Sequence, residues 1–222
     1  MKTAIPAFLF TILLSCAGAD KKTTSEAGKA TVPATASTTT NLTAADTTGQ
    51  LMPEDEFWKI IEASHAASNN KYRVQIDWLS NKMASTEPAE IVKFNNTFNA
   101  LLAASYNYRL WGASYVINGG CSDDCFEYFR EYIIAHGKEK FYATYLDPES
   151  CISWIKSEDQ EEWEGIRYAA SNAYKLKTGK DIPETAAPGF DKIQGKPFDE
   201  ATVEQQYPLL AKKFSGRHQS SQ

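Results

Sequence analysis

Apolar side chains recur at helical spacing along most of the chain after residue 52, and this spacing limits the fold more than any other sequence feature. In the clearest run, which we expect Thr86 to cap, the residues of one face are Ile91, Phe94, Phe98, Leu101, Leu102 and Ser105. No segment shows the sustained alternation and β-branched enrichment of a half-buried strand. The sequence therefore predicts an all-α fold.

Glycine, proline and acidic residues divide this region into further helices. Pro53, followed by three acids, is typical of a helix start. We expect the other helices near residues 71–83, 110–117, 122–137, 141–146 and 161–177, with a short one from about Phe198. The glycines expected to end helices are Gly119-Gly120, Gly137 and Gly179. On the helix near 161–177, the residues expected to face inward are Trp163, Ile166, Ala170 and Tyr174.

The start of the chain has the plan of an export signal. Lys2 precedes an apolar run over residues 4–14, and Ser15 precedes Cys16. The run is too short to span a bilayer, which takes about 20 apolar residues. Leu13 to Cys16 resembles the bacterial lipobox, in which the cysteine receives a diacylglycerol and becomes the first mature residue. We therefore predict a lipoprotein signal peptide over 1–15 and lipidation of Cys16.

Composition divides the rest of the precursor into three parts. Residues 16–50 are rich in Thr, Ala and Ser and have little to bury, so we expect a flexible tether that reaches about 30 Å from the lipid. Residues 51–180 form the helical domain, and 181–222 form a Pro/Gly-rich C-terminal strap that ends in a disordered tail. Ala17 favours the outer membrane, since it is not the aspartate of an inner-membrane retention signal. The expected product is an exported protein held to a membrane by its lipid.

The formal net charge is −5, and basic residues are interspersed with acids. No basic stripe with interleaved aromatic residues is present, which argues against nucleic acid as a partner. No motif calls for a cofactor.

Three cysteines remain once Cys16 is lipidated: Cys121, Cys125 and Cys151. Export allows disulfides to persist, and an odd number means that at least one thiol is free or pairs between molecules. Cys121 and Cys125 would bridge if the first precedes a helix and the second lies in its first turn. Pairing of Cys151 with either one, or three buried thiols, are the alternatives.

Residues 111–130 combine two glycines, two cysteines and several acids. One helix is expected to end at Gly119-Gly120, and the next to begin at Ser122, Asp123 and Asp124. Their side chains suit the free N–H groups and the positive dipole of a helix start. This capping role explains Ser122 and at least one aspartate.

A ligand-binding role for the same stretch stays open beside the capping role. Asp123 and Glu127 lie four residues apart and Asp124 is a neighbour of Glu127, so the three carboxylates could converge. With Asn118 and loop carbonyls they could hold a divalent cation such as calcium, although no known loop spacing matches. The full candidate set is Trp111, Asn118, Ser122, Asp123, Asp124, Glu127 and Arg130.

The other expectations for this stretch are structural. Trp111, Tyr115 and Phe129 have the spacing of core residues, and Arg130 is expected to pair with Glu127 or near Asp124. A nucleophilic Cys121 would need a nearby base, and the sequence supplies none. No pair of histidines or cysteines has the spacing of a zinc site with a matching second pair.

The motif over 111–130 closely resembles the signature of the bacterial domain-of-unknown-function family 4240. Phe57-Trp58 with Ile60-Ile61 resembles the first helix of that family, and Ala173-Tyr174 with Thr178-Gly179 resembles its closing one. The resemblance covers roughly residues 52–180 and implies a small helical domain without an established activity. Cys125 departs from the pattern, where glycine is usual.

Two functions follow as hypotheses. The first is a non-catalytic binding or interaction module, for an unknown protein or small molecule, displayed on a membrane. The alternative is a hydrolase or metal-dependent enzyme that uses Asp123, Asp124 and Glu127, with Cys121 as a further candidate. A third hypothesis is an immunity or toxin-neutralising partner.

Overall fold

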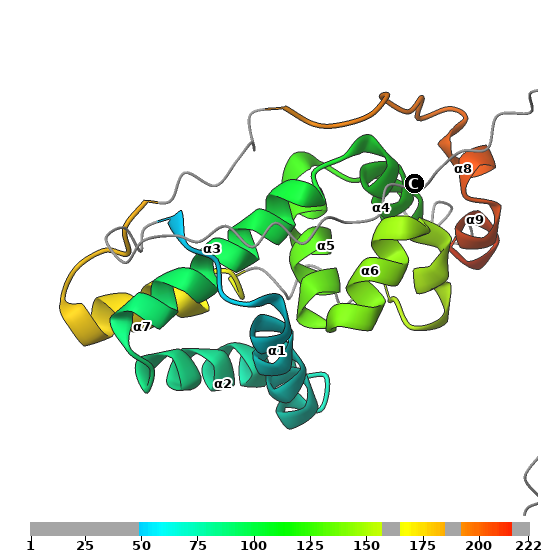
Figure 1. The fold of residues 1–222 in the computed structure, drawn as a ribbon. Coiled ribbons are helices and arrows are strands. Elements are labelled where there is room, and N and C mark those ends of the chain that lie inside the picture. The colour runs from blue at the N-terminus through cyan, green and yellow to red at the C-terminus, as the bar shows by residue number, and fades with distance from the viewer. Residues whose placement is uncertain (1–48, 157–164, 185–191, 215–222) are drawn as a thin grey trace, which may run out of the picture. The chain divides into compact units, whose positions relative to one another are not determined.

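The computed structural model describes residues 49–156, 165–184 and 192–214 (Figure 1). The expected signal peptide, Cys16, nearly all of the tether, Trp163 and the expected disordered tail lie outside these residues. The described part is helical, with no β-strand and one isolated bridge between Asn107 and Gln194. The predicted all-α, multi-helix fold is thus confirmed. No helix in the described ranges is both long and apolar enough to cross a membrane.

The described helices follow the predicted pattern closely. Their bounds are α1 Glu54–Ser68, α2 Tyr72–Ala84, α3 Pro88–Ala104, α4 Tyr108–Asn118, α5 Asp123–Ala135, α6 Lys138–Leu146, the 3₁₀ helix η2 Pro148–Ser153, α7 Tyr168–Thr178, α8 Val203–Gln206 and α9 Pro208–Phe214. Pro53 precedes α1, and the left-handed residues Gly119 and Gly179 end α4 and α7. These turn signals are local, which is why the sequence located them.

Three helix starts differ from expectation. Thr86 does not cap α3: its hydroxyl donates to the carbonyl of Lys82 in α2, and α3 begins at Pro88. The helix expected from about 161 begins, in the described part, only at Tyr168, because Gly165 has a φ of 100° and the chain turns there. The short helix expected from Phe198 begins at Val203.

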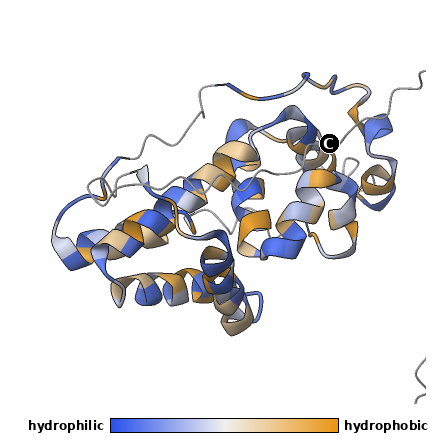
Figure 2. Cartoon of the chain, viewed as in Figure 1, coloured by the Kyte–Doolittle hydropathy of each residue, from blue (hydrophilic) through white to orange (hydrophobic). Residues whose placement is uncertain are grey.

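The core is a single cluster of apolar side chains contributed by most of the helices. Helix α2 packs against α1 and α7, α3 packs against α7, and α5 packs against α4 and α6. Phe57 of α1 is fully buried in this cluster, with its ring 4.9 Å from that of Phe94 and 6.3 Å from that of Phe98. Burial of each such side chain contributes roughly 1.5–3 kcal/mol. Figure 2 shows the hydrophobic positions recurring among hydrophilic ones along each helix.

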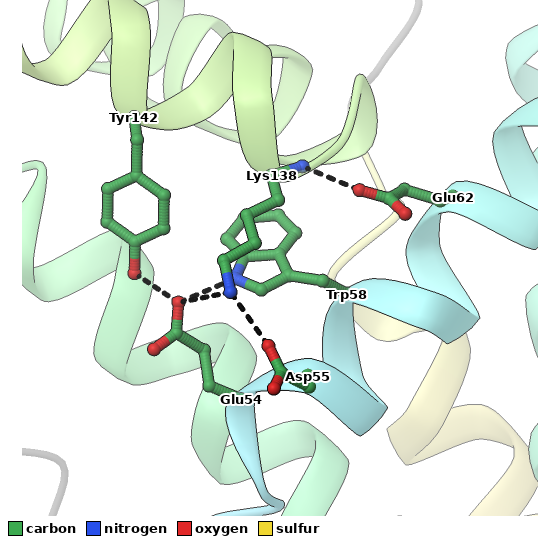
Figure 3. A network of polar contacts seen from close by, with 6 residues as sticks. All are labelled: Glu54, Asp55, Trp58, Glu62, Lys138 and Tyr142. Atoms are coloured by element: carbon green, nitrogen blue, oxygen red, sulfur yellow. Dashed lines mark hydrogen bonds and ion pairs between the residues drawn. The ribbon is translucent and has the colours of Figure 1, made fainter. Parts of the chain in front are cut away.

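A polar network joins the start of α1 to α6 (Figure 3). One carboxylate oxygen of Glu54 accepts hydrogen bonds from the Tyr142 hydroxyl at 2.8 Å and the Trp58 indole at 3.1 Å. The Lys138 ammonium lies 2.8 Å from the Asp55 carboxylate. Burial and the bond to Glu54 raise the pKa of Tyr142 to about 12, so this hydroxyl remains a donor. The network fixes α6, and with it α5, relative to α1.

Residues 192–214 of the C-terminal strap lie against α4. Gln194 exchanges backbone hydrogen bonds with Tyr106 and Tyr108, and the Tyr207 hydroxyl donates to the carbonyl of Arg109 at 2.7 Å. A β-carbon at Gly112 would lie 3.0 Å from the Tyr207 ring. The absence of a side chain at this position of α4 therefore lets the strap approach closely.

Candidate functional site

The turn between α4 and α5 is built by local interactions. Gly119 and Gly120 have φ values of 72° and 124°, which glycine adopts without strain. The Ser122 hydroxyl accepts from the backbone N–H of Cys125 at 3.3 Å and caps α5. A disulfide joins Cys121, just before the helix, to Cys125 in its first turn, while Cys151 is free and buried.

Trp111 and Asn118 support this turn from α4. The Trp111 indole donates to the carbonyl of Cys121 at 2.9 Å, and its ring stacks on Phe126 with centroids 5.2 Å apart. The Asn118 amide donates to the carbonyl of Ser114 at 3.0 Å. Among the expected core residues, Phe129 is buried, whereas Trp111 and Tyr115 are half-buried against the core.

A pocket of about 790 Å³ opens beside this turn, and we call it the charged pocket. The sequence-derived candidates among its lining residues are Asp123, Asp124, Glu127 and Arg130. Those that the sequence did not indicate are Asn95, Asn99, Tyr106, Arg167, Ile182, Pro183 and Glu184. Trp111, Asn118 and Ser122 are not part of the described lining, so the structure gives them a supporting role at the turn.

Arg130 is buried and bonded to backbone carbonyls of neighbouring residues. Its side chain is 3% exposed, and its guanidinium donates to the carbonyls of Leu102 at 2.8 Å and Phe126 at 3.4 Å. The same group lies 4.9 Å from the centres of the Tyr106 and Phe126 rings. Burial lowers the pKa of Arg130 to about 10, with the charge of Glu127 opposing the shift. Arg130 therefore stays charged at neutral pH, and its guanidinium is held among these carbonyls and rings.

The second arginine, Arg167, is also engaged. Its guanidinium forms an ion pair with Glu127 and lies 3.9 Å from a carboxylate oxygen of Glu131. Glu131 is 1% exposed, and its second oxygen has no hydrogen-bond partner in the described structure. Burial raises the pKa of Glu131 to about 8, with the charge of Arg167 opposing the shift and that of Glu127 adding to it.

Glu131 is a functional candidate that the sequence analysis missed. It follows Asp124 and Glu127 at positions i+7 and i+4, so the three acids lie along one face of α5. This spacing is the sequence signal that could have placed Glu131 beside the other two acids. Spacing alone, however, does not show that the Glu131 side chain is buried.

The remaining acids of the charged pocket are unpaired. Asp123, Asp124 and Glu184 are exposed, and none forms an ion pair with a residue that the structure describes. The arginines are engaged by carbonyls, rings and the acids of α5. The pocket therefore presents uncompensated negative charge to an incoming ligand.

The donors considered for calcium are not brought together. Asn118 bonds to Ser114, and Glu127 pairs with Arg167. Within the described residues, no group of three or more His, Cys, Asp or Glu side chains has an arrangement that could hold a metal ion.

Comparison with known proteins identifies a family for this domain. Neither the curated proteins nor the solved structures contain a match to the chain. A family model described as "Protein of unknown function (DUF4240)" matches residues 52–176, more than half of the chain. The match includes α3, α5 and Arg167 of the charged pocket and ends before the C-terminal strap. The chain belongs to the DUF4240 family.

Proposed function

We propose that this protein is a membrane-anchored lipoprotein whose helical domain binds a cationic ligand in the charged pocket without catalysing a reaction. The export signal over 1–15 and the lipobox ending at Cys16 support the anchor, and Ala17 supports the outer membrane. The Thr-rich segment up to about residue 50 supports display of the domain on a tether.

The binding proposal rests on one observation: the acidic and the basic side chains of the charged pocket differ in whether other protein groups bind them. Asp123, Asp124 and Glu184 have no ion-pair partner in the described structure, whereas Arg130 and Arg167 are engaged by the protein. A concavity lined by carboxylates raises the local concentration of positively charged ligands. Charge-assisted hydrogen bonds from an ammonium or guanidinium group to these carboxylates would hold the ligand.

The size of the charged pocket suits a small molecule or a single protruding side chain. Ligand pockets commonly measure about 300–1,000 Å³, and this one measures about 790 Å³. The ligand is thus a small cation or a basic side chain of a protein partner.

One observation favours the enzyme alternative. Glu127 is paired with Arg167, whereas burial raises the pKa of Glu131, and two carboxyls in contrasting environments are a feature of acid–base catalysis. A catalytic acid must reach the substrate, however, and Glu131 is 1% exposed. Cys121 is bonded to Cys125 and supplies no thiolate. Binding is therefore the function that the geometry supports best.

Isothermal titration with agmatine, a guanidinium-bearing dication, tests this proposal, with succinate as the anionic control. The purified protein is compared with the Asp123→Asn/Asp124→Asn double variant and with Asp77→Asn, an exposed aspartate of α2 outside the pocket. We expect agmatine to bind the wild type and Asp77→Asn equally, and the double variant about tenfold more weakly or worse. Equal affinity for all three proteins, or preferential binding of succinate, would contradict the proposal. Saturable calcium binding lost in the double variant would favour the metal-dependent alternative.

A further inference from the structure

A second pocket, of about 470 Å³, lies between the start of α4, the end of α6 and the C-terminal strap. None of its described lining residues is shared with the charged pocket. The strap, drawn in orange toward α8 in Figure 1, supplies one wall and lies beyond the family match. The lining of this pocket therefore includes residues beyond those that the family model matches.

Aromatic rings form the apolar part of the second pocket. Tyr108, Tyr145 and Phe198 are half-buried there. The Tyr108 ring packs parallel to that of Trp111 at 6.2 Å and meets the Phe198 ring edge-on at 6.5 Å. The Tyr145 ring stacks on Phe141 at 6.2 Å. These contacts hold the rings in fixed orientations before any ligand arrives.

Several polar side chains of the second pocket have no partner in the described structure. They are the carboxamides of Gln194 and Gln206 and the ammonium group of Lys196, all exposed. Hydroxyl groups are the natural partners of carboxamides, which both donate and accept hydrogen bonds.

The charge of the second pocket is opposite to that of the first. Lys196 and Arg109 are cationic, and no described lining residue carries a carboxylate. Arg109 donates to the carbonyls of Tyr145 and Leu146, at 2.6 Å for the latter, so its guanidinium is held at the end of α6. Two of its five N–H groups are used in this way, which leaves donors for an anion.

We propose that the second pocket binds a saccharide that bears an acidic group, either a carboxylate or a phosphate. The C–H face of a sugar ring packs on the electron-rich faces of aromatic rings. Its hydroxyls pair with Gln194 and Gln206, and its acidic group pairs with Lys196 and the free donors of Arg109. A neutral sugar leaves both cations without a partner, and a simple anion leaves the rings and carboxamides unused. The aromatic rings, the carboxamides and the two cations together therefore favour an acidic sugar.

Nuclear magnetic resonance titration of the full chain tests this inference with four probes: glucuronate, glucose 6-phosphate, glucose and inorganic phosphate. We expect saturable binding of at least one acidic sugar and about tenfold weaker binding of glucose and of inorganic phosphate. Glucuronate alone would identify the carboxylate as the acidic group, and glucose 6-phosphate alone would identify the phosphate. Binding of neither acidic sugar, or equal binding of inorganic phosphate, would overturn the inference.

Matched variants assign the binding to this pocket. Lys196→Ala should remove most of the preference for an acidic sugar over glucose. Gln206→Ala should weaken the binding of the acidic sugar and of glucose alike. Both side chains are exposed and make no described contact, so these variants should fold. Lys192→Ala, an exposed lysine of the same strap outside the pocket, and Asp123→Asn/Asp124→Asn should leave the affinity unchanged. Unchanged binding by Lys196→Ala would contradict the inference, whatever the charged pocket binds.

Discussion

A carboxylate oxygen of Glu131 lies 3.9 Å from Nε of Arg167, although 36 positions separate the two residues in the chain. Arg167 directly precedes α7, and Glu131 lies in the second half of α5. The same arginine pairs with Glu127 at the charged pocket. Arg167 therefore links the buried carboxyl of Glu131 to the wall of the proposed binding site.

The Glu131→Gln variant tests the protonation of this buried carboxyl. Burial raises its pKa from 4.5 to about 8 in the folded protein. Between these values the unfolded carboxyl is ionised while the folded one keeps its proton, so the free energy of unfolding falls as the pH rises, by at most about 1.4 kcal/mol per pH unit. Glutamine does not titrate, so the variant should gain stability relative to the wild type between pH 5 and pH 8. Urea unfolding at both pH values measures the change.

Glu139→Gln, an exposed position of α6, is the control and should show no such change. Burial lowers the pKa of His136 to about 3, which gives an opposite slope below pH 6.5. That slope is common to all three proteins and cancels in their differences. A stability difference between Glu131→Gln and the wild type that is equal at pH 5 and pH 8 would mean that Glu131 is ionised in the fold.

Reduction of the Cys121–Cys125 disulfide should destabilise the domain modestly. The bond closes a short loop, since the cysteines have a sequence separation of 4, so the expected loss in free energy of unfolding is about 2 kcal/mol. Urea unfolding with and without dithiothreitol measures it, and a Cys121→Ser/Cys125→Ser variant should not respond. Burial raises the pKa of the Cys151 thiol to about 12, so this cysteine does not interfere. A wild type insensitive to dithiothreitol would show that the bond contributes nothing.

The Gly112→Ala variant should loosen the C-terminal strap. The new β-carbon would lie 3.0 Å from the Tyr207 ring and 3.3 Å from that of Phe198. Overpacking of this kind costs about 1–3 kcal/mol. Urea unfolding and the rate of trypsin cleavage at Lys212, an exposed residue of α9, measure the effect. Gly49→Ala, which meets nothing within 4 Å, is the control. Similar cleavage rates for both variants would refute close packing of the strap on α4.

Local signals made much of the fold predictable. Pro53, Gly119 and Gly179 mark helix ends through backbone geometry that each residue imposes by itself. The predicted Thr86 cap was wrong because a threonine hydroxyl can either cap the following helix or bond to a preceding backbone carbonyl. Here it donates to the carbonyl of Lys82 and does not cap α3. In the described part, the expected last helix begins late, after Gly165, because a single glycine inside an apolar pattern gives no sign of its φ.

The candidate site was predictable only where its residues are close in sequence. Asp123, Asp124, Glu127 and Arg130 share one helix, and spacing alone placed them together. Arg167 and Glu184 reach the charged pocket through tertiary packing, for which the sequence holds no local signal.

The most direct measurement of the central claim is a nuclear magnetic resonance titration of the protein with agmatine, read at backbone amides. The account predicts saturable shifts at Asp123, Asp124, Asn99 and Glu184, which line the charged pocket, and their loss in Asp123→Asn/Asp124→Asn. Shifts confined to other surfaces, or the same shifts in the double variant, would contradict it.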